Sequence, residues 1–327
     1  MSAPPITMVG AQGPPQTPLI EAREARIAVD GVIAIERLTL ATTGDRVVLA
    51  GDVGALLGAL TGVPRSAGGG GRVRVTRAGD DLELPGEAYV VAGSLRLAGK
   101  SVAEAAHVAT TGAAALDPPL PPRWTAGEYV EWGARLAGAS ASAARELGAA
   151  ALARTGLAAA RRRATGSLSL AERRALVIAQ AISAGPEVVI LEAPLGGLEG
   201  AAAAFVLHAV NVAAEGRRMV LSTGTLDVAS AEGAVARGAS HVVVLARGEV
   251  ALEGSPAELF AGARVYALTV RSNAEPLRAE LSARGIDLRG GPVRFSVALP
   301  AGTGSGEILA AASAARAAMV EMVALIG

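Results

Sequence analysis

The chain has 327 residues, half of them apolar, which is enough for one large packed domain or two ordinary ones. Its 30 basic and 30 acidic residues cancel, and few residues are aromatic. Such a chain lacks the charge that neutralises phosphates and the rings that stack on bases, so we expect no nucleic-acid partner. The absence of cysteine excludes disulfides and thiolate metal sites, and the three scattered histidines indicate no metal site.

No uninterrupted apolar run reaches the roughly 18 to 20 residues that span a bilayer. The longest apolar segments, 201–214 and 310–326, are each broken by polar or charged residues. The N-terminus shows no basic segment followed by an apolar one, so we predict no signal peptide. We therefore expect a cytoplasmic chain that reaches a membrane only through a partner.

The first half of the chain alternates between loops and short strands. Residues 1–20 are rich in Pro, Gly and Gln, which is typical of a disordered tail. Strands are predicted over 26–29, 33–40 and 45–50, and the last of these is apolar on both faces, as a central strand is. A glycine-rich loop over 66–71 is followed by alternating, strand-like sequence up to Leu97.

After a proline-rich stretch at 118–122 the period becomes helical. Helices are predicted over 126–136, 143–155 and 170–184, and buried strands over 188–191, 219–222 and 241–245. Strands that alternate with helices indicate an α/β fold with a mainly parallel sheet.

A second pattern begins near residue 264. It consists of a strand (264–271), a helix (274–284), a strand (293–299), a helix (305–318) and a possible last strand (319–326). We expect residues 261–327 to form a small α+β domain that follows a larger domain over 21–260.

Six segments between residues 120 and 259 together resemble one family. Leu168-Ser169-Leu170-Ala171-Glu172 opens a helix, Pro186 to Pro194 contains a buried strand that ends in Glu192-Ala193, and Gly197-Leu198-Glu199 follows it. Val220 to Gly224 covers the end of a further buried strand and the residues that follow it. Trp124 to Gly138 precedes these segments, and Leu245 to Leu259 closes the series.

These segments resemble, in order, the signature motif, Walker B strand, D-loop and switch strand of an ATP-binding-cassette (ABC) ATPase, with the start of its helical subdomain and its closing hairpin. The resemblance implies a P-loop NTPase-like cassette over 21–260, with a helical subdomain over about 118–184. It also implies a membrane permease as partner, and pairing with a second ABC subunit as a homodimer or heterodimer. The predicted C-terminal domain is similar to one that exporters of the ABC-2 type often carry.

A P-loop needs backbone N–H groups that face the phosphates, a lysine for the β- and γ-phosphates, and a Ser or Thr for Mg²⁺. After the strand that ends at Ala50, the chain has Gly51 and Gly54 but continues directly into Leu56-Leu57. Compared with the family pattern, the Gly-Lys-Ser/Thr segment is absent. Asp52 would place a negative charge beside any phosphate.

The only lysine of the chain, Lys100, stands in Gly99-Lys100-Ser101. Gly93 is one residue too distant for the P-loop spacing, and the sequence between Gly93 and Gly99 alternates like a strand. We therefore favour a turn after an edge strand over a phosphate site.

The other chemical positions of the family also differ. Glu192 stands at the metal-side position, Ala193 replaces the catalytic carboxylate and Gly224 replaces the switch histidine. No Gln stands in 110–117, where the Q-loop would fall. We therefore expect no hydrolysis and no certain cofactor, with weak binding of ATP and Mg²⁺ left open.

The signature serine, Ser169, is retained and would meet a γ-phosphate held by a paired subunit. It could equally be a helix N-cap that forms a capping box with Glu172. Leu170 and Ala171 replace two glycines, and Glu172 would face the nucleotide as a like charge.

Three functions are compatible with these residues. The first is a non-hydrolytic ABC subunit that docks on a permease, with Trp124 or Trp132 at the docking surface because Trp is enriched in interface hot spots. The second is a scaffold or regulatory module with no role in transport. The third, an ATPase with an unusual P-loop, is disfavoured by the losses at four positions.

Overall fold

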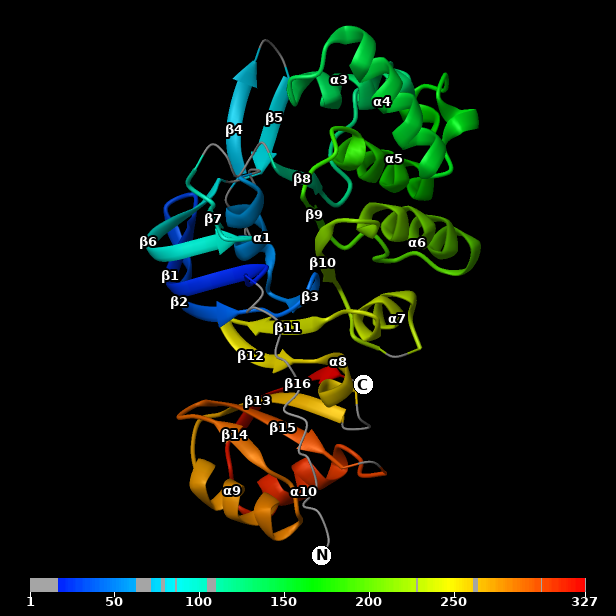
Figure 1. Ribbon diagram of the computed structural model, residues 1–327. Helices are drawn as coiled ribbons and strands as arrows, with labels where there is room; N and C mark the ends of the chain where they lie inside the picture. The colour runs from blue at the N-terminus through cyan, green and yellow to red at the C-terminus, as the bar shows by residue number, and fades with distance from the viewer. Residues whose placement is uncertain are drawn as a thin grey trace, which may run out of the picture.

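The fold is known from a computed structural model, which describes residues 17–62, 72–77, 80–85, 87–104, 110–227, 229–260, 264–300 and 302–326. Its centre is a six-stranded sheet in the order β12-β11-β3-β10-β9-β8 (Figure 1). The strands are β3 (Arg46–Gly51), β8 (Thr111–Ala114), β9 (Val188–Leu191), β10 (Arg218–Thr223), β11 (His241–Ala246) and β12 (Glu249–Gly254). All but β12 are parallel, as the α/β prediction requires.

Helices α5 (Leu170–Ser183), α6 (Gly200–Ala214) and α7 (Ala231–Arg237) lie on one face of this sheet (Figure 1). Helices α3 (Ala126–Leu136) and α4 (Ala141–Arg154) pack against α5. Short 3-10 turns at Ala158–Ala160 and Thr165–Ser167 connect α4 to α5. Apolar side chains from α3, α5 and α6 pack with the inner side chains of β9, β10 and β11 in one continuous core. That burial is the main stabilising contribution to this layer.

The other face carries α1 (Gly54–Thr61) and a second, antiparallel sheet in the order β2-β1-β6-β7. Its strands are β1 (Ile20–Val29), β2 (Val32–Ala41), β6 (Ala88–Leu97) and β7 (Lys100–Ser101). A separate core lies between the two sheets and includes Leu49, Leu56 and Ile190. A hairpin of β4 (Arg72–Arg77) and β5 (Asp80–Pro85) follows α1.

Residues 264–326 form their own four-stranded antiparallel sheet in the order β14-β15-β13-β16, with two helices on one face. The elements are β13 (Arg264–Val270), α9 (Ala274–Ala283), β14 (Leu288–Gly290), β15 (Arg294–Leu299), α10 (Gly306–Ala314) and β16 (Met319–Ile326). The short helix α8 (Pro256–Leu259) precedes this C-terminal unit, which lies at the bottom of Figure 1.

The sequence predictions differ from the structure at a few boundaries. Of the predicted tail, 1–16 lie outside the described residues, while Leu19 and Ile20 are fully buried and β1 begins at Ile20. The glycine-rich loop at 66–71 also lies outside them. The strand β14 was not predicted, and α10 ends at Ala314 rather than at residue 318. Within the described residues, no helix is long and apolar enough to cross a membrane.

Candidate functional site

The connection between β3 and α1 consists of two residues, Asp52 and Val53. The N–H group of Asp52 donates to the carbonyl of Leu245 at 2.9 Å, and that of Val53 donates to the carbonyl of Gly51 at 2.8 Å. These amides lie where a P-loop would turn its N–H groups toward phosphate, but both already have protein acceptors. The junction is therefore a tight turn rather than a cradle.

Side-chain and backbone contacts fix this turn against the end of β11. The Asp52 carboxylate accepts the N–H of Arg247 at 2.9 Å. Gly51 has φ +83°, and a Cβ placed there would lie 2.0 Å from the carbonyl oxygen of Leu245. Only glycine fits, because a methyl group would overlap the neighbouring strand. Gly54, by contrast, begins α1 with no atom near its missing Cβ.

Glu192 and Ala193 follow β9, at the same carboxyl edge of the sheet as Gly51. The Glu192 carboxylate accepts the N–H of Leu116 at 2.8 Å. Ala193 has the left-handed φ of +36°, and its N–H donates to Ser222 Oγ at 2.9 Å. The methyl group of Ala193 cannot act as a base for water.

Gly224 follows β10, between these two strand ends. Its N–H donates to Glu232 Oε1 at 3.1 Å. Glu232 comes from the first turn of α7 and is buried, with its carboxylate near both Gly224 and Gly196. The Glu232 carboxylate thus occupies the space beside Gly224.

The structure therefore brings Gly51, Glu192, Ala193 and Gly224 to one edge of the sheet. The carboxyl edge of a parallel sheet is where ligands of α/β proteins bind. The described residues contain no group of three or more His, Asp or Glu side chains that could hold a metal ion.

Ser169 forms the N-cap of α5. Its Oγ accepts the N–H of Glu172 at 3.3 Å, and the Glu172 carboxylate accepts the N–H of Ser169 at 2.8 Å, which completes a capping box. Arg163 forms an ion pair with the same carboxylate. Burial acts to raise the pKa of Glu172, but the Ser169 N–H and the Arg163 guanidinium outweigh it and hold this pKa below its ordinary value.

The Glu172 carboxylate thus forms an ion pair with Arg163 and points back over its own helix end. The arginine offsets part of the negative charge that Glu172 would present to a nucleotide. Leu168, the residue before the cap, is buried. The hollow beside Ser169 is lined by residues of α5, α6 and the 3-10 turn, including Ala171 and Phe205. The strand ends described above do not line it, so Ser169 and the sheet edge are separate surfaces of the chain.

A network that the sequence did not reveal connects these surfaces. Arg174 of α5 is buried, and its guanidinium donates to both carboxylate oxygens of Asp117, at 3.2 and 3.1 Å. It also donates to the carbonyls of Pro194 and Gly196, at 3.2 and 2.5 Å. One side chain therefore joins the signature helix to the segment after β8 and to the loop after β9.

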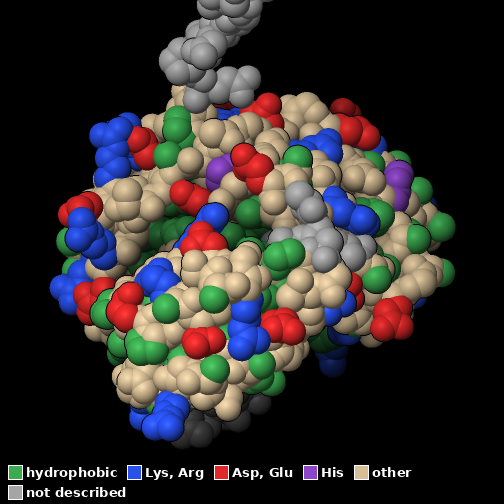
Figure 2. Space-filling view, turned by 90° about the horizontal axis from the view of Figure 1, so that it is seen from below, with side chains coloured by type: hydrophobic (Ala, Val, Ile, Leu, Met, Phe, Trp, Pro, Cys, Tyr) green, Lys and Arg blue, Asp and Glu red, His purple; other side chains and the backbone are tan. Residues whose placement is uncertain are grey.

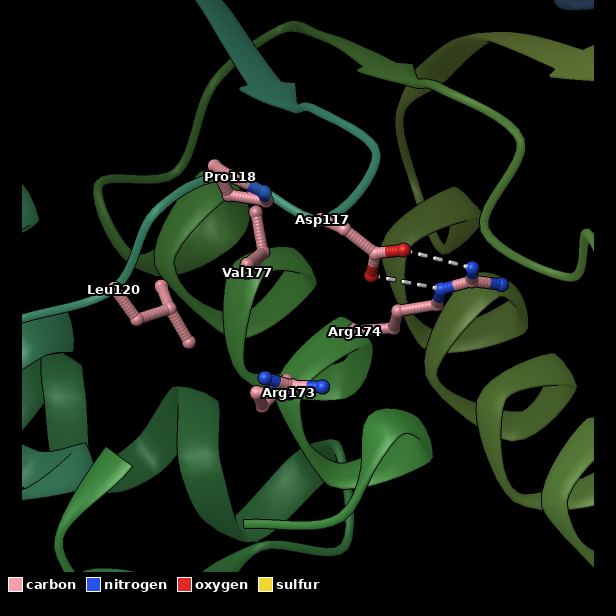
Figure 3. Close-up of a pocket in the computed structure, with 6 residues that line it drawn as sticks. All are labelled: Asp117, Pro118, Leu120, Arg173, Arg174 and Val177. Carbon is pink, nitrogen blue, oxygen red and sulfur yellow. Dashed lines mark hydrogen bonds and ion pairs between the residues drawn. The ribbon is translucent and has the colours of Figure 1, made fainter. Parts of the chain in front are cut away.

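Figure 3 shows the pair beside a small cavity of about 150 Å³. Asp117 and Arg174 face each other, while Pro118, Leu120 and Val177 form an apolar side and Arg173 lies apart from the pair. The signal in the sequence was an arginine on the apolar side of a helix, three residues after Ala171 and four before Ile178. A charge in such a position needs a partner.

Lys100 lies on β7 and forms an ion pair with Glu187 at 2.8 Å. Glu187 immediately precedes β9, so this pair stands at the amino end of the strand, opposite the edge that holds Glu192. The lysine is therefore remote from the β3–α1 turn. The predicted turn lies at Ala98 and Gly99, whereas Lys100 and Ser101 form the edge strand β7.

Trp124 and Trp132 are 37% and 46% exposed, and their rings meet edge to face with centroids 5.8 Å apart. Thr125 forms a capping box with Glu128 at the start of α3, which fixes Trp124 just before the helix. Leu136, one turn after Trp132, is 67% exposed. Tyr129 of the same helix is buried, so its role is packing.

The chain matches no family model. It is 30% identical over 232 residues to the human phospholipid-transporting ATPase ABCA7, a match that covers 67% of this chain and 10% of that protein. It is 34% identical over 114 residues to the octopine permease ATP-binding protein P of Rhizobium meliloti, covering 35% of this chain and 41% of that one. The chain thus spans less than half the length of either relative.

Solved structures share the fold. The cbiO1 protein of Clostridium perfringens, part of the ABC transporter complex cbiONQ, superposes with a TM-score of 0.56 at 20% identity, covering 75% of this chain and 91% of that one. A nucleotide-free ATP-binding cassette from an ABC transporter gives 0.55 at 14% identity, with 73% and 92% covered. With these matches and the order of its motifs, the chain belongs to the ATP-binding-cassette family of ABC transporter proteins.

Proposed function

We propose that this chain is a non-hydrolytic ABC subunit of a membrane transporter complex, with residues 21–260 as the cassette and 261–327 as a small C-terminal domain. The observation that carries the proposal is the two-residue turn between β3 and α1. It contains no lysine and no hydroxyl, and the N–H groups of Asp52 and Val53 donate to protein carbonyls. Without a lysine or a hydroxyl in this turn, the cassette lacks the charge-assisted contacts that normally hold the β- and γ-phosphates.

Two further positions support the same function independently. Hydrolysis needs a carboxylate to orient water, and the methyl group of Ala193 cannot do this. Gly224 stands where the family has a switch histidine, and the Glu232 carboxylate lies beside it. This carboxylate would repel a γ-phosphate. Since these parts act as a unit, restoring one of them would not restore turnover. Any binding of ATP and Mg²⁺ by the isolated chain is therefore expected to be weak.

A subunit of this kind would pair with another ABC subunit, either a second copy or a competent ATPase. Ser169 offers one contact for a nucleotide held by that partner. The Arg163–Glu172 ion pair favours this role, because it offsets the negative charge at the N-terminus of α5. The chain would then lie peripherally on the inner face of the cell membrane, held there by a permease subunit.

The docking surface that we propose for the permease is the exposed pair Trp124 and Trp132. An exposed T-shaped tryptophan pair next to Leu136 presents apolar surface that folding leaves in water. Replacing Trp132 by Ala should cost about 2 kcal/mol of binding, since buried tryptophans dominate interface energies. It should leave the melting temperature nearly unchanged, because half of the side chain is exposed.

Affinity purification of the full chain from native membranes tests the proposal. We expect a multi-span membrane protein to co-purify with the wild type and with Leu309→Ala, a control that removes an exposed side chain of α10. It should be lost from Trp124→Ala or Trp132→Ala. Co-purification of soluble chains alone would favour the alternative, a scaffold or regulatory module with no role in transport.

A further inference from the structure

A cavity of about 380 Å³ lies between the β11–β12 hairpin and the outer face of the C-terminal sheet. One wall is formed by Gly51, Asp52 and the carboxyl end of β11, and the other by β13, β15 and the end of β14. The volume falls within the range of small-molecule sites, and the first wall is the edge of the sheet at which α/β proteins bind ligands. The cavity shares no lining residue with the Ser169 hollow.

The strand register defines which side chains of the C-terminal sheet face this cavity. Arg289 pairs with Ser296, and Arg294 lies two residues before Ser296 on the same strand. Successive side chains of a strand alternate between faces, so Arg289 and Arg294 lie on one face as diagonal neighbours, about 7 to 8 Å apart. Phe295 points to the opposite face, where it belongs to the core under α9 and α10.

Two of the three carboxylates that line the cavity already have donors, and the third, Glu249, lies 3.8 Å from Arg294. Asp52 accepts the N–H of Arg247, and Glu321 accepts both the Thr269 hydroxyl, at 3.0 Å, and the Arg247 guanidinium. These contacts join the hairpin to the C-terminal sheet. They also leave little acceptor capacity for a cationic ligand.

The two diagonal arginines, in contrast, are held loosely. Arg294 lies 3.8 Å from the Glu249 carboxylate, which is longer than a hydrogen bond. Arg289 forms an ion pair with Asp287, its neighbour two residues away, and both side chains are at least 70% exposed. Exposed ion pairs of this kind contribute little, so an anion could take their place at small cost. Figure 2 shows basic and acidic side chains interspersed over this side of the molecule, with recessed hydrophobic side chains between them.

We propose that the cavity binds a small organic anion, whose carboxylate or phosphate group is held by Arg289 and Arg294. Its apolar body would lie against Val250, Ala251 and Ala267, which line the cavity between the charges. Because the two walls belong to different parts of the chain, the bound molecule links the β11–β12 hairpin to the C-terminal sheet and stabilises their contact. This site requires neither a nucleotide nor a permease, so it is independent of the function proposed above.

Calorimetric titration of the full chain at low ionic strength tests the site with hexanoate and hexyl phosphate as probes. At least one of them should bind and raise the melting temperature. Uncharged 1-hexanol lacks the anionic head group, and inorganic phosphate lacks the apolar body. Each should therefore bind at least tenfold more weakly. The stronger of the two anionic probes identifies the head group that the arginines prefer.

Substitution locates the site. Arg289→Gln and Arg294→Gln should each reduce the affinity about tenfold, since each removes charge-assisted hydrogen bonds. Arg264→Gln changes an exposed arginine of the same sheet that does not line the cavity, and it should leave the affinity unchanged. Equal binding of 1-hexanol, no binding of either anion, or full affinity in both cavity variants would overturn the proposal.

Discussion

The β3–α1 turn and the start of α5 resemble the two halves of one nucleotide site of the family, yet they differ in how closely they match it. At α5, Ser169 is present and forms a capping box that stabilises the helix end. The turn contains no lysine and no hydroxyl, and Gly51 fits tightly against the carbonyl of Leu245. In both regions, the residues that persist are those with a structural role in the fold. Under the function that we propose, motif residues survive where they hold the scaffold together, and not where they would serve only the chemistry.

The largest effect is expected at Gly51. Gly51→Ala should lower the free energy of unfolding by at least about 3 kcal/mol, because the methyl group overlaps a backbone oxygen and alanine is strained at φ +83°. Gly54→Ala is the matched control, since its added methyl group meets nothing and it begins a helix. That change should stabilise the protein slightly, by up to about 1 kcal/mol. Urea denaturation measures both, and a tolerated Gly51→Ala would contradict the tight turn.

Arg174 tests the connection between the two regions. Arg174→Met should cost about 3 kcal/mol, because it removes a buried bidentate pair and leaves the carbonyls of Pro194 and Gly196 without their donor. Arg173→Gln, at the exposed neighbouring position, should change stability by less than about 0.5 kcal/mol. Equal effects of the two substitutions would mean that the network does not hold the helical layer to the sheet.

The smallest effect concerns the capping box and depends on pH. The folded-state pKa of Glu172 lies below its ordinary value, so its stabilising contribution is present above the unfolded pKa and is lost as the pH falls through the folded one. Glu172→Gln should therefore cost about 1 kcal/mol at pH 7 and less as the pH is lowered to 3. Thermal unfolding at both pH values measures this difference.

Glu146→Gln, at an exposed position of α4, provides the baseline for that comparison. Glu128 and Glu258 also belong to capping boxes with a lowered pKa, but they titrate equally in each variant and cancel in the difference. A cost for Glu172→Gln that does not change with pH would show that the carboxylate charge has no part in the cap.

Much of this fold was predictable from periodicity and motif order. The predicted bounds of α3 and β9 agree with the structure because a strong helical period and a fully apolar run leave few alternatives. The strand β14 was missed because three residues between turns carry no period. The motif resemblance singled out Gly51, Glu192 and Gly224, and the structure places them at one edge of the sheet.

What the sequence could not give were contacts between distant segments. Nothing near Asp117 indicates that its carboxylate meets Arg174, 57 residues later. Likewise, no local pattern indicates that the carboxylate of Glu232, on α7, accepts the N–H of Gly224. The cavity beside Arg289 and Arg294 depends on how the C-terminal sheet faces the β11–β12 hairpin, which no local pattern encodes.

The central claim is that the fold of an ABC ATPase persists here without its phosphate chemistry. Calorimetric titration of the purified full chain with Mg²⁺–ATP, together with measurement of phosphate release, tests it most directly. We predict no release above background and a dissociation constant well above the micromolar range, because the missing charge-assisted phosphate contacts are worth about 1.5 to 3 kcal/mol each. Micromolar binding, or Mg²⁺-dependent turnover that Lys100→Ala abolishes, would contradict the claim and assign the phosphate site to Gly99-Lys100-Ser101.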